Sequence, residues 1–447
     1  MTKLNEHPTV KNYYANRQPP DKVAEPKPLN AKELRELVLR LGADDVGFVS
    51  VGRPELDDQR EYILKAFPNT KTLISIVVKS AKQNLRTPYR SIANEEFHNV
   101  YDRLNEIGRE IVLDLSKQGV EALYTPSGFP MEMDQYPGRI WVVAHKPVAE
   151  AAGLGKMGLH RNVIHPKFGN FINLETILID REVEEESVPI DYSPCIGCNL
   201  CVNACPVGAI SLDGHFNFAA CATHNYREFM GGFTDWVGTV ADSKDRHDYH
   251  ARVTDSETAS MWQSLSFKAD YKAAYCISVC PAGEDVIGPF LEDPKQFYSD
   301  VVEPLRSKEE SLYISPNSDA AEYAKKNFPH KPVRIVGAGI RPQSVPHFLK
   351  SMPPVFQREQ SAGLNATFHF TFRGAYKGLA TVRIADKELE ILEGHIGKSN
   401  VRIRSDSDYW IEFLKGERSL AYGLLTGRIL ATGNILLMPG FERCFPK

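Results

Sequence analysis

Alternating apolar and polar positions divide the first part of the chain into short helices and strands. The segment that begins at Asn30 has the spacing of an amphipathic helix and ends near Leu41, just before Gly42. The pattern then predicts strands at 45–51, 72–79, 120–124, 139–144 and 172–180, and helices at 57–66 and 96–118. This alternation of strands and helices predicts an α/β domain over residues 30–189.

The rest of the chain differs in pattern. Residues 1–29 are polar and proline-rich and are expected to form an extended arm. Residues 190–290 hold most of the cysteines, and residues 291–343, rich in proline and charge, are expected to form a linker. The pattern then predicts strands at 366–374, 377–386 and 389–394 and helices at 407–416 and 419–429. These elements predict a separate α+β domain at 344–447.

Charge and cysteine content narrow the possible partners. The formal net charge is −4 and the pI is about 6.4, so nucleic acid and membrane surfaces are not expected partners. The sequence contains no apolar stretch of ~20 residues and no signal-peptide or twin-arginine pattern. Seven of eight cysteines lie between Cys195 and Cys280, which indicates metal binding in a reducing compartment. We therefore expect a cytoplasmic protein.

The spacing of the cysteines is the strongest functional signal. Cys195 opens a CxxCxxCxxxCP run that ends at Pro206, and Cys276 and Cys280 form a second run before Pro281. In such proteins three closely spaced thiolates hold one iron–sulfur cluster and the fourth ligates another. We therefore predict two sets of ligands. The first, for a [4Fe-4S] cluster, is Cys195, Cys198, Cys201 and Cys280; the second is Cys205, Cys221 and Cys276.

The second set is one thiolate short. A full CxxCxxxCP run would have cysteine at position 273, where this chain has Ala273. The alternatives are a [3Fe-4S] cluster or a [4Fe-4S] cluster with a ligand other than cysteine. A zinc site is a further alternative for the whole segment, although seven cysteines exceed the four ligands that zinc takes. Cys444 is expected to be a free thiol without a role.

The cysteine pattern resembles that of epoxyqueuosine reductases and reductive dehalogenases. The matching segments are CIGCNLCVNACP, Cys221, YCISVCP and the AGLGxxG stretch within 145–180, and the resemblance covers roughly residues 30–290. It implies a nitroreductase-like α/β domain that binds base-off cobalamin, followed by a ferredoxin-like two-cluster domain that passes electrons to the cobalt. It also implies an electron donor such as ferredoxin or flavodoxin.

The glycine-rich loop is the expected contact with the corrinoid. Gly153, Leu154, Gly155 and Gly158 follow a segment with helical character, whereas a dinucleotide-binding loop should follow a strand. The resemblance implies that these residues let the flat corrin approach the backbone. The alternative is a helix end followed by a turn.

Several side chains are candidate acids beside the cobalt. The dehalogenase branch uses a tyrosine with a basic partner, and the matching positions are Tyr101 and Arg161, with His160 adjacent. A cationic neighbour would lower the pKa of the tyrosine. The epoxyqueuosine reductase branch instead has an aspartate in a VDSxPV segment. This chain has VVAHKPV there, with His145, so Asp134 is the alternative acid.

The C-terminal segment resembles the sterol-carrier-protein-2 domain. The resemblance rests on the ATFHFTFRG, IRSDSDYWIEFLKG and GRILATGN segments within 344–447. It implies a sheet with helices over an apolar tunnel and an apolar ligand. The alternative is a filled interior, in which Trp410, Phe413, Leu424 and Leu437 are core residues.

These observations predict a corrinoid- and iron–sulfur-dependent reductase. Its substrate would be a small organic molecule, hydrophobic if the C-terminal domain serves it, and the reaction would be reductive dehalogenation or deoxygenation. One alternative is a two-cluster electron-transfer protein without corrinoid. The other is an epoxyqueuosine reductase that acts on tRNA, which the acidic composition and the different C-terminal domain disfavour.

Overall fold

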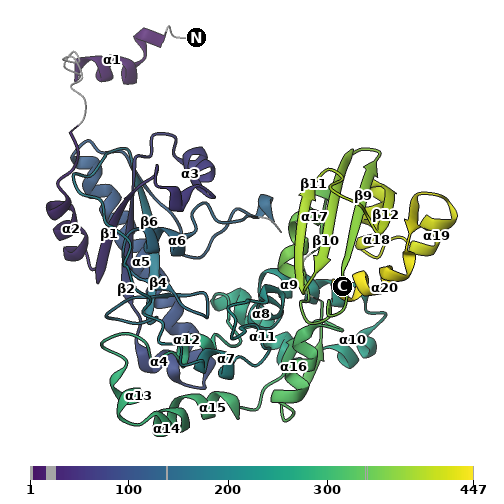
Figure 1. The fold of residues 1–447 in the computed structure, drawn as a ribbon. Coiled ribbons are helices and arrows are strands. Elements are labelled where there is room, and N and C mark those ends of the chain that lie inside the picture. Colours follow the sequence, from purple (N-terminus) through teal and green to yellow (C-terminus); the bar gives the residue numbers. More distant parts are fainter. Residues whose placement is uncertain (1–3, 17–26, 137–138, 338, 340, 446–447) are drawn as a thin grey trace.

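The computed structural model describes residues 4–16, 27–136, 139–337, 339 and 341–445. Figure 1 shows an N-terminal α/β part, a helical part that contains the cysteine segments, and a C-terminal part built on a second sheet.

A four-stranded antiparallel sheet forms the centre of the N-terminal part. Its order is β1 (Asp45–Ser50), β2 (Thr72–Lys79), β6 (Ile172–Ile179) and β3 (Ala122–Tyr124). Alternate residues of β2 enter two different cores: Ile74 and Ile76 face one, and Leu73 and Val77 face the other. Both faces of the sheet are therefore covered.

Helices cover the two faces of this sheet. The core with Ile74 packs against α2 (Ala31–Arg40) and α5 (Arg90–Lys117), and the opposite core packs against α3 (Arg60–Ala66) and α6 (His145–Ala151). The Asn30 side chain caps α2 by accepting the Glu33 N–H. Helix α5 begins earlier than predicted and follows the short α4 (Lys82–Arg86).

Two predictions for this part are wrong. Residues 139–144 do not form a strand, because the Gln59 side chain, rather than a neighbouring strand, bonds the backbone of Ala144. The arm is not wholly extended either. Residues 8–15 form α1 (Pro8–Ala15), with proline in the first turn and the His7 side chain as its N-cap, and the helix has no buried residue. Residues 17–26 of the predicted arm lie outside the described residues.

The cysteine segments lie among short helices. They are α7 (Leu200–Ala204), α8 (Phe218–Asn225), α9 (Met230–Asp242), α10 (Arg246–Arg252), α11 (Asp255–Phe267) and α12 (Tyr275–Ser278). Helix α12 contacts both α7 and α4, so the second cysteine run is held between the first run and the α/β part.

The expected linker at 291–343 is a folded part of the same unit. It contains α14 (Pro294–Phe297), α15 (Glu303–Arg306), α16 (Asp319–Asn327) and the parallel strands β7 (Leu312–Ile314) and β8 (Val333–Ile335), and α13 (Gly288–Glu292) precedes it. Leu312 and Ile314 are buried in one core with Cys205. Val302 and Leu305 are buried in a second core with Cys201. The prediction of a linker was wrong because the segment contributes buried apolar residues to both cores.

The C-terminal part is a five-stranded sheet with helices on it. The order is β11 (Glu388–Glu393), β10 (Gly378–Ala385), β9 (Ala366–Arg373), β12 (Val401–Asp406) and β13 (Ile429–Gly433), and only the β9–β12 pair is parallel. The helices are α17 (Val345–Val355), α18 (Ser407–Leu414), α19 (Leu420–Leu425) and α20 (Met438–Arg443). The helix predicted at 419–429 ends early, because Gly427 adopts a φ of +70° before β13 begins.

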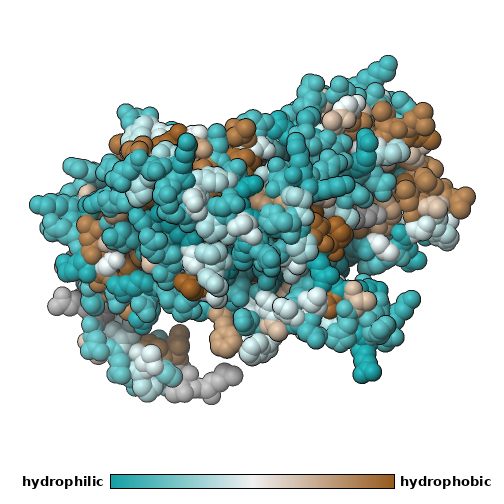
Figure 2. Space-filling view, turned by 90° about the horizontal axis from the view of Figure 1, so that it is seen from below, coloured by the Kyte–Doolittle hydropathy of each residue, from teal (hydrophilic) through white to brown (hydrophobic). Residues whose placement is uncertain are grey.

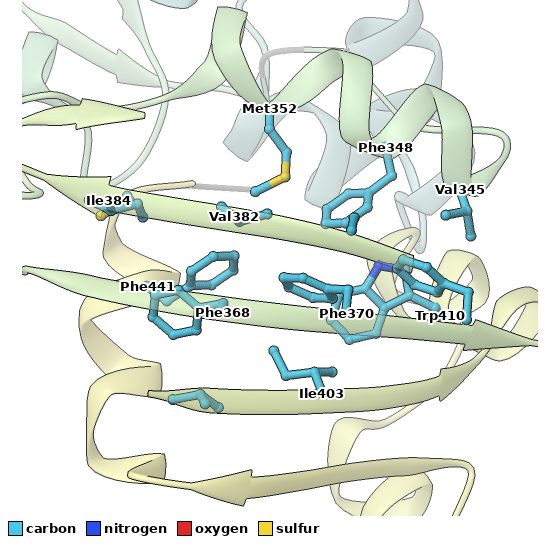
Figure 3. Packing of buried hydrophobic residues seen from close by; sticks show 14 of the residues in the cluster. Val345, Phe348, Met352, Phe368, Phe370, Val382, Ile384, Ile403, Trp410 and Phe441 are labelled. Atoms are coloured by element: carbon cyan, nitrogen blue, oxygen red, sulfur yellow. The ribbon is translucent and has the colours of Figure 1, made fainter. Parts of the chain in front are cut away.

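Aromatic side chains fill the space between this sheet and its helices. Figure 3 shows Phe348, Phe370 and Trp410 in contact, and Phe368 lies against Phe441 with 4.6 Å between ring centroids. The predicted apolar ligand would compete with these side chains for the same space.

One surface of the C-terminal part is apolar. Figure 2 shows apolar residues gathered at the end of the molecule where α19 and η5 (Ile435–Leu437) lie, and Leu425 and Leu436 are 87% and 85% exposed. Within the described ranges, no helix combines the length and apolarity that crossing a bilayer requires.

Candidate functional site

Four cysteines surround a small void, and we call this group the first cysteine site. Cys195, Cys198, Cys201 and Cys280 line a void of about 20 Å³ together with Leu159 and His160. Burial, followed by the neighbouring cysteines, raises the pKa of the Cys201 thiol to about 12. A cationic metal centre would be needed to hold these sulfurs as thiolates. The donor set thus fits the iron–sulfur cluster predicted for these four residues.

Three cysteines form a second cysteine site beside the first. Cys205, Cys221 and Cys276 line the wall of a cavity of about 570 Å³. Burial, followed by the nearby Cys205, raises the pKa of the Cys276 thiol to about 12. The two sites adjoin, because Cys276 also contributes to the raised pKa of Cys201. The structure therefore groups the seven cysteines in the two sets that we predicted.

The cysteines do not converge as the ligands of a single ion would. No group of three or more His, Cys, Asp or Glu side chains in the described part of the chain is arranged to hold one metal ion. Zinc would require such a tetrahedral group. Cys444 lies elsewhere, fully buried in the C-terminal core, with its Sγ 3.1 Å from the Gly440 carbonyl oxygen.

The cavity lies between the second cysteine site and the α/β part. Its wall includes Phe97 and Tyr101 of α5, His145 and Lys146 of α6, and the loop with His160 and Arg161. This loop joins β4 (Lys156–Met157) to β5 (Val163–Ile164). No aspartate or glutamate is present among the described residues of the wall. Its titratable groups are phenols, imidazoles, the three cysteine thiols, the Lys146 amine and the Arg161 guanidinium.

Tyr101 faces the cavity, but its partner is not the predicted one. Its hydroxyl is hydrogen-bonded to that of Tyr271, and burial raises its pKa. The Arg161 guanidinium instead donates to the Gly214 carbonyl oxygen at 2.8 Å. The predicted lowering of the tyrosine pKa by Arg161 is therefore wrong. Tyr271 lies edge-on to Tyr226, whose phenol lies near Cys221 and Cys276.

His160 lies between the two cysteine sites, and Lys146 lies on the cavity wall near Cys221 and Cys276 of the second site. His160 lines both, and its Nδ1 accepts the Asn162 N–H at 3.1 Å, so the neutral ring carries its proton on Nε2. Burial, with Lys146 next, lowers the His160 pKa to about 4, so the ring is neutral at pH 7. Lys146 Nζ donates to the Arg161 carbonyl oxygen at 2.9 Å and to Asn162 Oδ1 at 2.8 Å.

Two groups of predicted site residues lie away from the cavity. Asp134 is exposed, in a single helical turn at 133–135, and does not line the cavity. Gly153, Leu154, Gly155 and Gly158 do not line it either. A Cβ on Gly153 would meet the Val188 carbonyl oxygen at 2.3 Å, and one on Gly155 would meet that of Ile164 at 2.4 Å. These glycines therefore permit close packing of the backbone, and the contact with a corrinoid predicted for them stays a prediction.

The sequence did not single out Lys146 and Tyr271. Lys146 lies in the VVAHKPV segment, in which only its neighbour His145 was noted. That imidazole is occupied at both nitrogens, 3.0 Å from Thr176 Oγ1 and from the Pro126 carbonyl oxygen. Tyr271 stands shortly before the second cysteine run, and this position is the feature of the sequence that could have indicated a place near the site.

Known proteins resemble parts of this chain. The family model of a 4Fe-4S binding domain matches residues 188–211. The epoxyqueuosine reductase of Lactococcus garvieae is 27% identical over 178 residues, which cover 37% of this chain and 46% of the relative. That of Staphylococcus aureus is 35% identical over 80 residues, covering 18% and 20%. The predicted resemblance to epoxyqueuosine reductases is confirmed. The chain spans less than half the length of these relatives.

Solved structures include both branches of the predicted resemblance. An epoxyqueuosine reductase with an epoxyqueuosine-modified tRNA-Tyr stem loop has 19% identity and a TM-score of 0.31, over 45% of this chain and 57% of that one. A reductive dehalogenase, described with a mechanism for B12-dependent dehalogenation, has 16% identity and a TM-score of 0.38, over 61% and 35%.

The expectation about nucleic acid needs correction. The net charge, together with the different C-terminal domain, led us to expect that nucleic acid would not be a partner. The curated relatives are epoxyqueuosine reductases, and one solved epoxyqueuosine reductase is bound to a tRNA stem loop. Net charge averages over the whole surface, so it does not report on a local binding face.

Proposed function

We propose that this chain is an iron–sulfur- and corrinoid-dependent reductase of the epoxyqueuosine reductase type. The observation that carries the proposal is the order of its parts: the first cysteine site, then the second, then a cavity lined by phenols. Adjacent clusters in such an order would pass single electrons from the first site to the cavity wall.

The residues fit the cofactors that the resemblance implies. The first site would hold a [4Fe-4S] cluster, consistent with the family match at residues 188–211, and the three cysteines of the second site would hold another cluster. Phe97, Trp141 and Phe229 give the cavity apolar walls against which a flat macrocycle could pack. Bound cobalamin would supply a reducible cobalt centre beside the substrate.

Tyr101 is the proposed proton donor. Its hydroxyl lies on the cavity wall, and the hydrogen bond with Tyr271 holds it in place. Because burial raises its pKa, the phenol keeps its proton until a strongly basic centre develops on the substrate. His160 is neutral at pH 7 and carries a proton on Nε2, so it would position polar groups rather than supply positive charge.

The curated relatives favour an epoxyqueuosine nucleoside in tRNA as the substrate. A second candidate is reductive cleavage of a small halogenated substrate. The specific observation in its favour is that the cavity offers a tyrosine rather than a carboxylate, as in the dehalogenase branch of the resemblance.

The test uses the full chain, purified without oxygen and with cobalamin supplied. The reduced protein is incubated separately with tRNA that contains epoxyqueuosine and with a bromophenol. Mass spectrometry measures loss of one oxygen atom from the nucleoside, and ion chromatography measures bromide release. We expect the first reaction. Bromide release alone would select the second candidate, and failure of both, or failure to bind cobalt, would overturn the proposal.

Tyr101→Phe tests the proton donor. We expect cobalt and iron contents to stay unchanged and turnover to fall to about 1% of the original, because a proton transfer step loses its donor. Tyr124→Phe, a change in the exposed Tyr124 of β3, is the matched control and should retain full turnover. Unchanged turnover in Tyr101→Phe would exclude this phenol as the donor.

A further inference from the structure

The two cysteine runs repeat one local pattern with one substitution. Cys198, Cys201 and Cys205 are spaced by three and four residues, and Ala273, Cys276 and Cys280 have the same spacing. A proline follows the last cysteine of each run. Ala273 therefore occupies the position that corresponds to Cys198.

The backbone repeats the pattern as well. Asn199 directly follows Cys198 and has φ +59° and ψ +12°, and Ala274 directly follows Ala273 and has φ +54° and ψ +25°. Each begins a short helix, α7 or α12. Asparagine tolerates this left-handed conformation, whereas alanine adopts it at a cost. The second run thus keeps the conformation of a cluster-binding loop although the thiol at position 273 is missing.

The methyl group of Ala273 stands at the boundary between the second cysteine site and the cavity. Ala273 lines the cavity with Cys205, Cys221 and Cys276. Its N–H and that of Ala274 both donate to Asn225 Oδ1 at 3.0 Å, which ties the loop to the end of α8, the helix of Cys221. A cluster held by the three thiolates would therefore leave one corner directed at the cavity rather than at protein.

Other side chains near this corner are not free to replace the thiolate. His224 Nδ1 accepts the Tyr313 N–H at 3.3 Å, so the neutral ring has its proton, not a lone pair, on Nε2. Asn225 Oδ1 already accepts two N–H groups. The Tyr226 ring is held by contacts with the rings of Phe229 and Tyr271. Cys444 lies in the C-terminal core.

We propose that the second cysteine site holds a [4Fe-4S] cluster through three thiolates and that its fourth iron is an exchangeable binding site open to the cavity. That iron would take water or hydroxide at rest and a small anionic donor, a thiolate or carboxylate, when one enters. The Lys146 ammonium at the cavity wall, with two of its three donors engaged, favours an anion there. This inference rests on the cluster-binding part of the proposed function and is independent of corrinoid and tRNA.

Oxidation gives a way to test whether this iron can leave the cluster. Ferricyanide removes one electron from [4Fe-4S]²⁺ to give the 3+ state, and loss of one Fe²⁺ then leaves [3Fe-4S]⁺, so charge and iron balance. The first site, with four thiolates around a closed void, should resist this loss. Electron paramagnetic resonance distinguishes the two cluster forms, because [3Fe-4S]⁺ is paramagnetic and [4Fe-4S]²⁺ is not.

The experiment compares the full chain with Ala273→Cys, both reconstituted with iron and sulfide without oxygen, corrinoid or tRNA. We expect brief oxidation of the wild type to release one iron per chain and give the three-iron signal. Fe²⁺ added with dithionite, which returns the electron that ferricyanide removed, should reverse this. Added mercaptoethanol should change the spectrum of the reduced wild-type cluster. Ala273→Cys, which restores a fourth thiolate, should show neither response.

Two results would overturn the inference. One is a wild type that keeps all its iron under oxidation or responds as Ala273→Cys does. The other is a three-iron cluster that, reduced by dithionite, does not take up Fe²⁺. If Ala273→Cys does not fold, uptake of ⁵⁷Fe²⁺ by the oxidised and then dithionite-reduced wild type, read by Mössbauer spectroscopy at a single site, decides the question. Because no turnover is measured, a failed reductase assay leaves this result unaffected.

Discussion

The two cysteine sites share a local design and differ in their surroundings. Both use a loop with a left-handed residue at the start of a short helix. The first encloses a void of about 20 Å³ with four sulfurs, whereas the second opens with three sulfurs onto a cavity of about 570 Å³. Under the proposed function, the first site would serve electron transfer and the second could also meet a ligand.

A different buried arginine lies beside each site. Arg86 packs against the rings of Phe171 and Phe297, and its charge interacts with Cys280 of the first site. Arg90 is 8% exposed, packs against the Tyr275 ring, and its charge interacts with Cys276 of the second site. In both arginines Nε and Nη2 have no hydrogen-bond partner within the described structure. A bound cluster would supply the missing negative charge.

The largest expected effect comes from removing one of the three thiolates. Cys276→Ser should eliminate the second cluster and reduce turnover to below about 1%, because two thiolates do not retain a cube. Iron analysis should show loss of one cluster while the first persists. Cys444→Ser, which changes a buried cysteine of the C-terminal core, should keep all the iron. Equal iron loss in both variants would indicate general misfolding instead.

Cys198→Ala should make the first site resemble the second. The repeated spacing predicts a cluster that survives reduction but yields a three-iron signal on oxidation. Exchange of its open iron with added thiolate should be slower than at the second site, because the void is closed. The measurement is the EPR amplitude of oxidised protein over time. Complete loss of the first cluster would show that the two loops are not equivalent.

A carboxyl group with a raised pKa lies behind the cavity wall, outside the residues that line it. Glu175 is buried behind Ser127, whose Oγ donates to it at 2.9 Å, and burial raises the Glu175 pKa to about 8. The folded state therefore binds this proton more tightly than the unfolded state. The resulting stability is fully present below about pH 4.5 and is lost as pH rises through about 8.

Glu175→Gln should therefore match the wild type near pH 5 and exceed it at pH 8 by on the order of 3 kcal/mol. Urea unfolding from pH 5 to 9 measures this difference. Glu61→Gln, at an exposed position of α3, should leave it near zero throughout. A pH-independent difference for Glu175→Gln would mean that the carboxyl group does not titrate in this range.

The smallest effect concerns reduction potentials. Arg90→Met should lower the potential of the second cluster, and Arg86→Met that of the first, each by on the order of tens of millivolts, because a buried cation stabilises the reduced form. EPR-monitored redox titrations measure both clusters at once. Arg90→Lys, which retains the charge, should shift the second potential less. Equal shifts of both clusters would argue against one arginine per site.

Local signals predicted the local structure well. The Asn30 cap, the apolar spacing of α5 and the alternation in β9 and β10 each depend on residues close in sequence. The strand predicted at 139–144 does not form, and the Gln59 side chain bonds both the N–H and the carbonyl oxygen of Ala144. The linker predicted at 291–343 failed because burial of Leu312 and Ile314 depends on a distant core.

The order and spacing of the cysteines by themselves determined that the chain has two cluster-binding loops and that one of them lacks a thiol. The sequence suffices for this because the conformation of such a loop depends on residues only a few positions apart in the chain. Only the tertiary structure decided what each loop faces. Packing of α12 against α4 and α7 brings Cys280 to the first site and turns Ala273 toward the cavity. The same packing pairs Tyr101 with Tyr271 instead of Arg161, since contacts between residues far apart in sequence form only when separate elements are packed together.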